Sequence, residues 1–459
     1  MASRSGIDRS RRPAPGPAPA VSLPTFSRFS LNNRLNVLAI RHDDIPEVSA
    51  RLVLPFGAAE DERQHAGTSL LTARALTEGT KDRSAPAVAE WLDYLGARLS
   101  VDVDYDASMV SLHFLSRVFD GALEFLAETL AEPAFEAKEV ERLRDERLDE
   151  IASGLDEPRV VAGLRVNEAT FGDHAYGVRV GGIEETVRAI DSSVLGRFHS
   201  RFYRPSDATL VIVGDLPEPS ELHDRLEAAF SRWDGAAEEP GQLVEPEQLR
   251  RSRLWAVNWP GPQSEIRVGG IGISRTDPDY PAVLVMNSIL GGLFSSRINM
   301  NLREDKGWTY GASSRFDGRK RRGPYVVSTA VDAKATVPAV REILGEMDRM
   351  KSEPATDEEL SLAVNALTLS LPRMFETAGQ VSGRVAQQVI YRLSDDYWEV
   401  YAREIRAVTR DDVRRVAERF LTSDQIAIVV VGPADEYRDE LGELAAVEMR
   451  DIHGRPVPG

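Results

Sequence analysis

An internal repeat is the feature that most restricts how this chain can fold. Residues 187–215 and 405–433 align without a gap at an offset of 218 residues, which places Gly214 opposite Gly432. Each copy has the pattern of a helix, a polar turn and a buried apolar strand that ends at glycine. A period of this length is too long for a solenoid, and it predicts a duplicated domain of about 220 residues.

The chain length and local composition divide the sequence into regions. A chain of 459 residues has room for two such domains. Residues 233–252 are rich in Glu, Pro and Gly, so we expect them to link an N-terminal domain, residues 25–232, to a C-terminal domain, residues 253–459. Residues 1–24 have alternating Pro and Ala without the apolar core of a signal peptide, which predicts a disordered tail.

Apolar periodicity predicts both strands and helices in each copy. The expected strands of the two copies are 35–42, 48–55, 97–104, 108–115 and 208–214, and then 253–259, 265–273, 309–317 and 323–331. The expected helices are 65–78, 84–95, 118–130, 136–154, 158–170, 191–202 and 279–304, with further helices filling 335–421. Strands at hairpin spacing with helices grouped between them predict an α+β fold, in which each domain has a mostly antiparallel sheet with helices on one face.

Charge and residue usage argue against several classes of function. The net charge of −17 disfavours binding to nucleic acid or to anionic lipid. The absence of cysteine excludes disulfides, thiolate metal sites and cysteine nucleophiles. We expect no membrane span and a cytoplasmic location, or a periplasmic one if a leader has been removed. The basic cluster 319–322 is expected to be a solvated hairpin tip, with a partner or polyanion contact as the alternative.

The stretch HAGTSLLTARALTEGT, residues 65–80, has the shape of a metal-binding helix without the ligands. Leu70, Ala73 and Arg74 stand at i, i+3 and i+4 on one face. Histidine, glutamate and histidine at such a spacing would bind zinc and activate a water molecule. Leucine cannot bind a metal, alanine cannot accept a proton, and arginine repels a cation. The seven histidines are scattered and offer no replacement pair on a helix.

The surroundings of this helix resemble the insulinase/pitrilysin family of zinc metallopeptidases. That family carries a His-x-x-Glu-His motif followed a few residues later by Gly-Thr, and a Gly-Thr pair stands here at 79–80. By this resemblance the three positions named above are those of the first His, the Glu and the second His. The resemblance also implies a third ligand on a later helix, for which Glu150 is the best match, although it is equally an ordinary helical acid. The segment HAYGVRVGG, residues 174–182, matches a further family pattern.

A second part of the resemblance lies in the C-terminal copy, in SSRINMNLREDKGWTYGASS, residues 295–314. The family has an arginine at the end of a helix and a tyrosine seven residues later, and these correspond to Arg303 and Tyr310. The resemblance implies that the phenol stabilises an oxyanion and that the guanidinium holds substrate carbonyls. A surface ion pair and a strand start are the alternatives. Gly291 and Gly292 are candidates for lining a peptide cleft, or for close packing.

Retention of this pair without the zinc motif suggests a divided active site. The resemblance implies the zinc-free subunit of a heterodimeric metalloendopeptidase, which forms half of a clamshell around an extended peptide substrate. We expect no cofactor in this chain and zinc in a homologous partner with an intact His-x-x-Glu-His motif. Nucleic acid and membrane are not expected partners. The alternative is a non-catalytic scaffold or a peptide-binding homodimer with the same fold.

Overall fold

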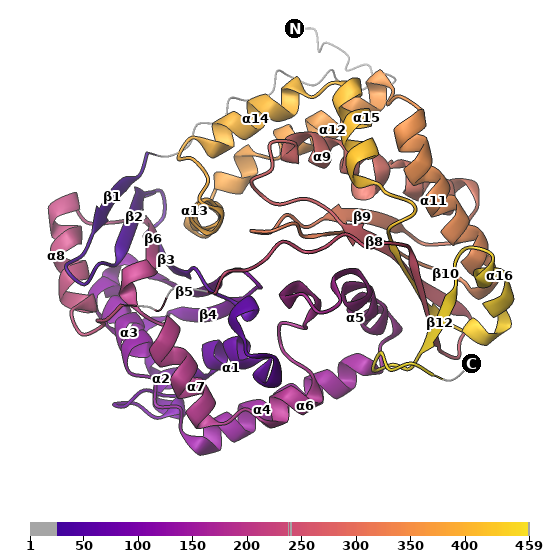
Figure 1. Ribbon diagram of the computed structural model, residues 1–459. Coiled ribbons are helices and arrows are strands. Elements are labelled where there is room, and N and C mark those ends of the chain that lie inside the picture. The colour runs from indigo at the N-terminus through magenta and orange to yellow at the C-terminus, as the bar shows by residue number, and fades with distance from the viewer. Residues whose placement is uncertain (1–24, 237, 239–240, 458–459) are drawn as a thin grey trace, which may run out of the picture.

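Two six-stranded sheets, one in each half of the chain, form the framework of the molecule (Figure 1). The computed structural model describes residues 25–236, 238 and 241–457, so the tail predicted for residues 1–24 lies outside the described residues. The N-terminal sheet contains β1 (Ser27–Ser30), β2 (Asn36–Arg41), β3 (Glu47–Leu54), β4 (Arg98–Val103), β5 (Ser108–Leu115) and β6 (Thr209–Gly214) in the order β1-β2-β6-β3-β5-β4. The C-terminal sheet contains β7 (Arg253–Asn258), β8 (Gln263–Ile271), β9 (Ala312–Phe316), β10 (Pro324–Asp332), β11 (Ala427–Gly432) and β12 (Val447–Arg450) in the order β12-β7-β11-β8-β10-β9.

The two sheets share one topology, which confirms the duplication. Strands β2 and β6 pair in parallel, as do β7 and β11. All neighbours in the runs β6-β3-β5-β4 and β11-β8-β10-β9 pair antiparallel. Helix α7 (Ser192–Phe202) and β6 precede helix α15 (Arg410–Phe420) and β11 by the 218 residues of the sequence repeat. Only the outermost strands differ, because β1 is antiparallel to β2 whereas β12 is parallel to β7. These two short outer strands were not predicted.

Most helices lie close to their predicted ranges, but α6, α8 and α16 were not predicted. In the N-terminal half they are α1 (Thr68–Ala75), α2 (Ala85–Leu95), α3 (Phe119–Ala131), α4 (Ala137–Leu155), α5 (Pro158–Phe171), α6 (Glu184–Arg188), α7 and α8 (Pro219–Phe230). In the C-terminal half they are α9 (Tyr280–Asn287), α10 (Arg297–Asn299), α11 (Thr336–Ser352), α12 (Asp357–Leu369), α13 (Ala378–Tyr391), α14 (Tyr397–Ala407), α15 and α16 (Arg438–Gly442).

The single helix expected at 279–304 is interrupted. Wider π-helical turns occupy Ser288–Gly292 and Met300–Asp305, and the chain becomes extended at Leu293 and again at Ser296. The whole segment, Tyr280–Asp305, has the length and mean hydropathy of a membrane-crossing helix, but 61% of its apolar window is buried inside the protein. Its apolar side chains form part of the C-terminal core, which accounts for the hydropathy.

Each half of the chain contributes a helix to the sheet of the other half. Helices of the same half cover one face of each sheet, as predicted. The second face of the N-terminal sheet packs against α13, where Val381 and Val385 contact apolar side chains of β2, β3 and β6. The second face of the C-terminal sheet packs against α5 through Val161 and Val166. Because both faces are covered, these strands are apolar on both sides, and the two halves share their cores.

The basic cluster 319–322 joins the two halves, so the expectation of a solvated hairpin tip was wrong. Arg319 is only 6% exposed, and its guanidinium lies 4.2 Å from the centre of the Tyr105 ring. The backbone N–H of Lys320 donates to the Asp106 carboxylate at 2.7 Å, and its Nζ donates to the Asp106 carbonyl at 2.6 Å. Aromatic faces and carbonyls of the N-terminal half replace water around these cations. The cluster therefore acts as an internal clasp.

The segment predicted as a linker is anchored to both halves. In its described part, 233–252 contains no helix or strand. Trp233 is 1% exposed and its indole N–H donates to the Tyr203 carbonyl at 3.1 Å. The carbonyl of Leu243 accepts a hydrogen bond from Arg321 of the clasp at 2.8 Å. The segment, called the strap below, is therefore held in place along the surface. The predicted domain boundaries at 232 and 253 remain a prediction.

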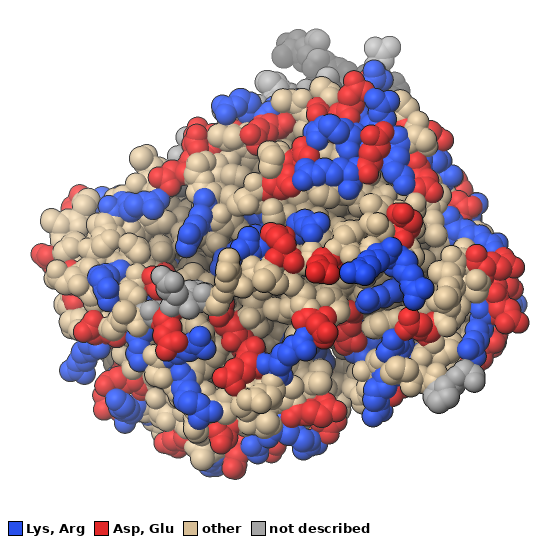
Figure 2. Space-filling view, viewed as in Figure 1, with Lys and Arg blue, Asp and Glu red and all other residues tan. Residues whose placement is uncertain are grey.

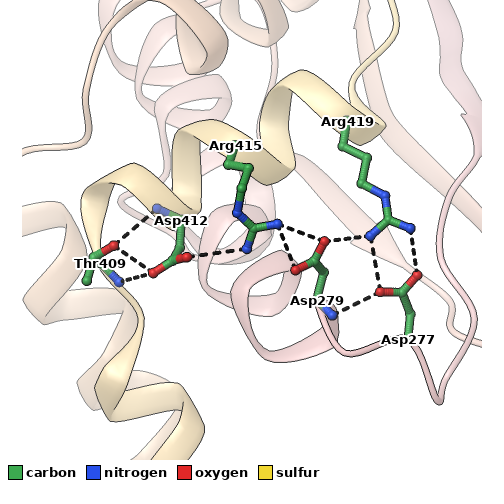
Figure 3. A network of polar contacts seen from close by, with 6 residues as sticks. All are labelled: Asp277, Asp279, Thr409, Asp412, Arg415 and Arg419. Carbon is green, nitrogen blue, oxygen red and sulfur yellow. Dashed lines mark hydrogen bonds and ion pairs between the residues drawn. The ribbon is translucent and has the colours of Figure 1, made fainter.

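Two arginines of α15 tie the repeat unit to the start of α9 (Figure 3). The Nη1 of Arg415 donates to both carboxylate oxygens of Asp279 at 2.8 and 2.9 Å, and Arg419 contacts Asp277 at 3.0 Å. Their counterparts in the first copy, Arg197 and Arg201, contact Ser193 and Glu238 instead. The sequence repeat thus preserves the arginines, while their partners depend on the surroundings of each copy.

Acidic and basic side chains are interspersed on the face shown in Figure 2. Helix α4 illustrates the pattern, because Arg142 pairs with Glu139 at 2.9 Å and with Glu146 at 2.6 Å along one side of the helix. On this face no broad basic stripe is visible, as a polyanion-binding surface would require.

Candidate functional site

Helix α1 carries the three zinc-motif positions and packs against α4 and α7. The carboxylate of Asp61 accepts hydrogen bonds from the backbone N–H groups of Gly67 at 2.8 Å and Ser69 at 2.9 Å, which fixes the start of the helix. Burial raises the pKa of Asp61 to about 7, although these hydrogen bonds act in the opposite direction. Gly67 has a φ of 104°, a left-handed conformation that favours glycine. The scaffold of the helix is therefore intact.

An ion pair lies at the positions that the family resemblance assigns to the zinc motif. Ala73 is 1% exposed, and Leu70 is partly buried. The Nη1 of Arg74 lies 2.8 Å from one oxygen of Glu150, and the Nη1 of Arg147 lies 2.7 Å from the other oxygen. The structure thus places Glu150 opposite α1, where the family resemblance puts the third ligand.

These residues do not fit a zinc ion. Two guanidinium groups occupy both oxygens of Glu150, and no other side chain at the motif positions can bind a metal. Burial alone would raise the pKa of Glu150, but the hydrogen bonds and positive charges of Arg74 and Arg147 together lower it. Among the described residues, no three His, Asp or Glu side chains are grouped in a way that could hold a metal ion.

Arg147 is a member of this site that the sequence analysis missed. It is 7% exposed, and its Nε donates to the Gly181 carbonyl at 2.8 Å. A Cβ on Gly181 would lie 2.3 Å from the guanidinium, so this approach requires glycine. The i, i+3 spacing of Arg147 and Glu150 on α4 is a signal that could have suggested the pairing.

The HAYGVRVGG segment, residues 174–182, has a structural role next to this site. Tyr176 is fully buried, and its hydroxyl donates to the Asp106 carboxylate at 2.6 Å. The imidazole of His174 accepts from the backbone N–H of Tyr176 at 3.0 Å and contacts the Val244 carbonyl with its other nitrogen. The segment therefore links the clasp, the strap and the start of α1.

Tyr310 stands on a fixed backbone with a free side chain. It is 93% exposed, the highest exposure among the large hydrophobic side chains described as exposed. The hydroxyl of the neighbouring Thr309 donates to the Gly311 carbonyl at 2.9 Å and contacts the Thr329 hydroxyl at 3.0 Å. Asn299, which is 3% exposed, accepts from the N–H of Ala312 at 3.0 Å. The phenol is therefore presented to solvent from an ordered turn.

Arg303 lies on the same segment, and only some of its guanidinium nitrogens have a partner in the described part of the chain. Its guanidinium lies 4.3 Å from the centre of the Phe294 ring, which is itself 68% exposed. Glu304 is 3.3 Å from the Nη1 of Arg303, yet this nitrogen is buried and forms no hydrogen bond. In the described residues, no hydrogen bond joins Arg303 to Tyr310. The Tyr310 hydroxyl is therefore open to solvent, whereas the Nη1 of Arg303 is shielded from it.

The two predicted cleft glycines differ in their surroundings. A Cβ on Gly291 would lie 2.5 Å from the Ser314 hydroxyl, so Gly291 allows close packing against β9. Gly292 is exposed next to Phe294. The packing alternative thus has direct support at Gly291, and a role in peptide binding remains a prediction at both positions.

The zinc-motif helix and the Arg303–Tyr310 segment do not meet within the chain. The first lies in the N-terminal half with α4 and α7, and the second joins α10 to β9 in the C-terminal half. Within the described ranges, no hydrogen bond or ion pair links the two.

Comparisons with known proteins match nearly the whole chain. The family model described as insulinase (peptidase family M16) matches residues 37–182, and the model described as peptidase M16 inactive domain matches residues 189–367. An uncharacterized zinc protease of Streptomyces coelicolor is 26% identical over 418 residues, which are 89% of this chain and 90% of that protein. A probable mitochondrial-processing peptidase subunit beta of Arabidopsis thaliana is 21% identical over 435 residues, which are 91% of this chain and 80% of that protein.

Solved structures agree in fold. A peptidase M16 inactive domain from Pseudomonas fluorescens superposes with a TM-score of 0.83 at 25% identity, over 89% of this chain and 98% of that one. A protease from Helicobacter pylori superposes with a TM-score of 0.83 at 17% identity, over 90% of this chain and 100% of that one. Together with the degenerate motif on α1 and the two matched models, these likenesses identify the chain as a member of the insulinase family, peptidase family M16.

Proposed function

We propose that this chain is the zinc-free subunit of a heterodimeric metalloendopeptidase and that it supplies Arg303 and Tyr310 to a partner's zinc site. One observation carries the proposal. The Arg74–Glu150 ion pair lies at the positions that the resemblance assigns to the zinc motif, whereas Tyr310 is 93% exposed on an ordered backbone. Several relatives are named as zinc proteases, and one is named as a peptidase subunit.

The proposed roles follow from the chemistry of the two side chains. In peptide hydrolysis, negative charge develops on the oxygen of the scissile carbonyl. The Tyr310 hydroxyl would donate a hydrogen bond to that oxygen, which stabilises the transition state. The Arg303 guanidinium would donate to carbonyls of the peptide and hold it in register. The metal and the water it activates would come from the partner's His-x-x-Glu-His helix.

The surface around the pair supports contact with another molecule. Phe294, Met300 and Tyr310 are 68%, 39% and 93% exposed and come from one short stretch of the chain. Large apolar side chains on a soluble surface are common at binding sites when they are grouped. We propose that this stretch, with Gly292 beside it, faces the chamber between the two subunits. An extended peptide there could add its backbone to an outer strand such as β9 or β4.

Reconstitution tests the proposal. The purified chain is mixed with a homologous chain that carries His-x-x-Glu-His, in the presence of zinc, and cleavage of a quenched fluorescent peptide library is measured. We expect cleavage by the mixture and little or none by either chain alone. A partner that is fully active alone, or a mixture that forms a complex without activity, would contradict the proposal.

The alternative function is a scaffold or a peptide-binding homodimer. The Arg74–Glu150 ion pair is equally compatible with this alternative and with the heterodimer, because neither function needs zinc in this chain. Native mass spectrometry with metal analysis separates the two. A complex of two different chains with one zinc ion supports the heterodimer, and a metal-free dimer of identical chains supports the scaffold. A neighbouring gene for a chain with the intact motif would also favour the heterodimer.

A further inference from the structure

A cavity of about 350 Å³ lies beside the former metal position. Its wall is formed by α5 and by the segment that follows Tyr176, and it includes Leu164, Asn167, Arg179 and Val180. The volume is within the range of small-ligand sites, which is roughly 300–1,000 Å³. Nothing described so far uses this space.

Arg147 connects the cavity to the ion pair on α1. Its Nε donates to the carbonyl of Gly181, which lines the cavity, and its Nη1 contacts Glu150, the partner of Arg74. The cavity and the former metal position are thus separated by a single guanidinium group. A ligand in the cavity would lie within the electrostatic field of this group.

Arg179 is the unusual side chain of the cavity. It is partly buried, and within the described residues it forms no hydrogen bond and no ion pair. Burial, followed by the positive charge of Arg147, lowers the pKa of Arg179 to about 10, so the guanidinium is still protonated at neutral pH. Among the residues described, Glu150 is the only carboxylate that acts on this cation through its charge, and no hydrogen bond joins the two, so an anion placed against Arg179 would relieve the cost of its burial.

Positive side chains outnumber negative ones around the cavity, which favours an anion. Arg74, Arg147 and Arg179 surround one carboxylate, that of Glu150. The carboxylate in the cavity wall itself belongs to Glu168, which is held by the buried Arg165 at 2.8 Å. The presence of Glu168 in the wall disfavours a doubly charged phosphate more than it disfavours a carboxylate.

The polar groups of the cavity match the end of a peptide. The amide nitrogen of Asn167 donates to the Tyr176 carbonyl at 2.6 Å and to the Tyr105 hydroxyl at 3.3 Å, which leaves its oxygen free to accept. A guanidinium binds a carboxylate through two parallel hydrogen bonds. Leu164 and Val180 supply apolar surface for a side chain.

We infer that this cavity binds the C-terminal carboxylate of a peptide, with Arg179 as the carboxylate ligand and the Asn167 oxygen accepting a peptide N–H. The inference goes beyond the proposed function, because the binding needs neither zinc nor a partner and belongs to this chain alone. In this arrangement the former metal position has become the positively charged wall of an anion site.

Calorimetric titration of the isolated chain tests the inference. The probes are N-acetyl-alanyl-leucine with a free carboxylate, the same dipeptide as its C-terminal amide, and inorganic phosphate. We expect the carboxylate form to bind at least tenfold more tightly than the amide form, because the charge-assisted contact with Arg179 is lost in the amide. Phosphate should bind more weakly than the free-carboxylate dipeptide.

Two variants locate the binding. Arg179→Gln should weaken binding of the carboxylate form at least tenfold, and it should not lower the thermal unfolding midpoint because Arg179 has no partner to lose. Gly163→Leu adds a side chain on α5 at the cavity wall, where a Cβ meets no atom within 4 Å, and should block binding without disturbing the core. Arg117→Gln, at an exposed arginine remote from the cavity, is the matched control and should bind like the unaltered chain.

The outcomes are distinct. Selective binding of the carboxylate form that is lost in both cavity variants and kept in the control supports the inference. Equal binding of acid and amide, unchanged binding by Arg179→Gln, phosphate binding as tight as that of the dipeptide, or no binding of any probe each overturns it. All of these measurements use the isolated chain, so they stand apart from the success or failure of reconstitution with a partner.

Discussion

The zinc-motif helix and the Arg303–Tyr310 segment differ in how their polar groups are satisfied. At the helix, Arg74 has a carboxylate partner at 2.8 Å, and that carboxylate is also held by the buried Arg147. On the segment, Tyr310 is 93% exposed and a buried nitrogen of Arg303 has no hydrogen bond. The charges of the first region are paired within the chain, whereas the second presents the Tyr310 hydroxyl to solvent. The proposed catalytic contribution therefore rests on the second region.

The contrast has a physical reason. A buried or half-buried polar group without a partner is unfavourable, so a helix that has lost its metal needs internal partners for the remaining charge. The Arg74–Glu150 pair meets that need on α1. A site that binds another molecule must keep its donors free until the ligand arrives. Substitutions in the first region should therefore change stability, and substitutions in the second should change activity.

The largest effect is expected for Tyr310→Phe in the reconstituted complex. Removal of one oxyanion donor lowers kcat by about 10²–10³-fold in well-studied hydrolases. Because the side chain is 93% exposed, the free energy of unfolding should not change measurably. The measurement is kcat on the fluorescent peptide, together with urea unfolding of the isolated chain.

Tyr94→Phe is the matched control for this variant, since Tyr94 is 76% exposed on α2. It should leave both activity and stability unchanged. Equal activity of the Tyr310→Phe complex and the unaltered complex would remove the catalytic role and with it the main support for the heterodimer.

A smaller loss of activity is expected for Arg303→Lys. Lysine keeps the charge but loses the planar fork of donors, which should reduce kcat/KM by about 10–100-fold if the guanidinium holds peptide carbonyls. Arg373→Lys, at an exposed arginine of the same half, serves as the control. A loss that appears equally in both variants would assign the effect to general surface charge.

Arg74→Met should affect stability without affecting activity. The Arg74 and Glu150 side chains are 30% and 43% exposed, so their ion pair contributes at most about 1 kcal/mol. Arg147 remains beside Glu150 and prevents an unpaired carboxylate. We expect a decrease of about 0.5–1 kcal/mol in the free energy of unfolding in urea and unchanged peptide cleavage by the complex. A marked loss of cleavage would mean that this region also meets the substrate.

The smallest effect is the pH dependence of the same ion pair. The folded protein holds the pKa of Glu150 below its ordinary value of 4.5. A depressed carboxyl pKa stabilises the fold above the ordinary value, and this contribution is lost as the pH falls through the folded pKa. The difference in unfolding free energy between the unaltered chain and Glu150→Gln, below about 1 kcal/mol at pH 7, should therefore shrink toward acid pH. A difference that grows on acidification would contradict this assignment.

Much of the fold could be predicted because the signals are local. Helix and strand periods extend over a few turns, and the repeat gave the offset that relates α7 and β6 to α15 and β11. The exchange of α5 and α13 between the two sheets could not be predicted, because an apolar helix face does not specify which sheet covers it. The basic cluster 319–322 was assigned to solvent for a similar reason, since its partner Asp106 lies 214 residues from Lys320.

The sequence by itself determined the duplicated α+β fold and the spacing of Leu70, Ala73 and Arg74 on one helix face. The family roles of these three positions and of Arg303 and Tyr310 remain predictions. Only the tertiary structure decided that Glu150 meets Arg74, from which it is separated by 76 residues, and that Arg179 is left without a partner beside a cavity. The physical reason is distance along the chain. Residue identity and periodicity are local properties, whereas the partner of a charge depends on the path by which the chain brings distant segments together.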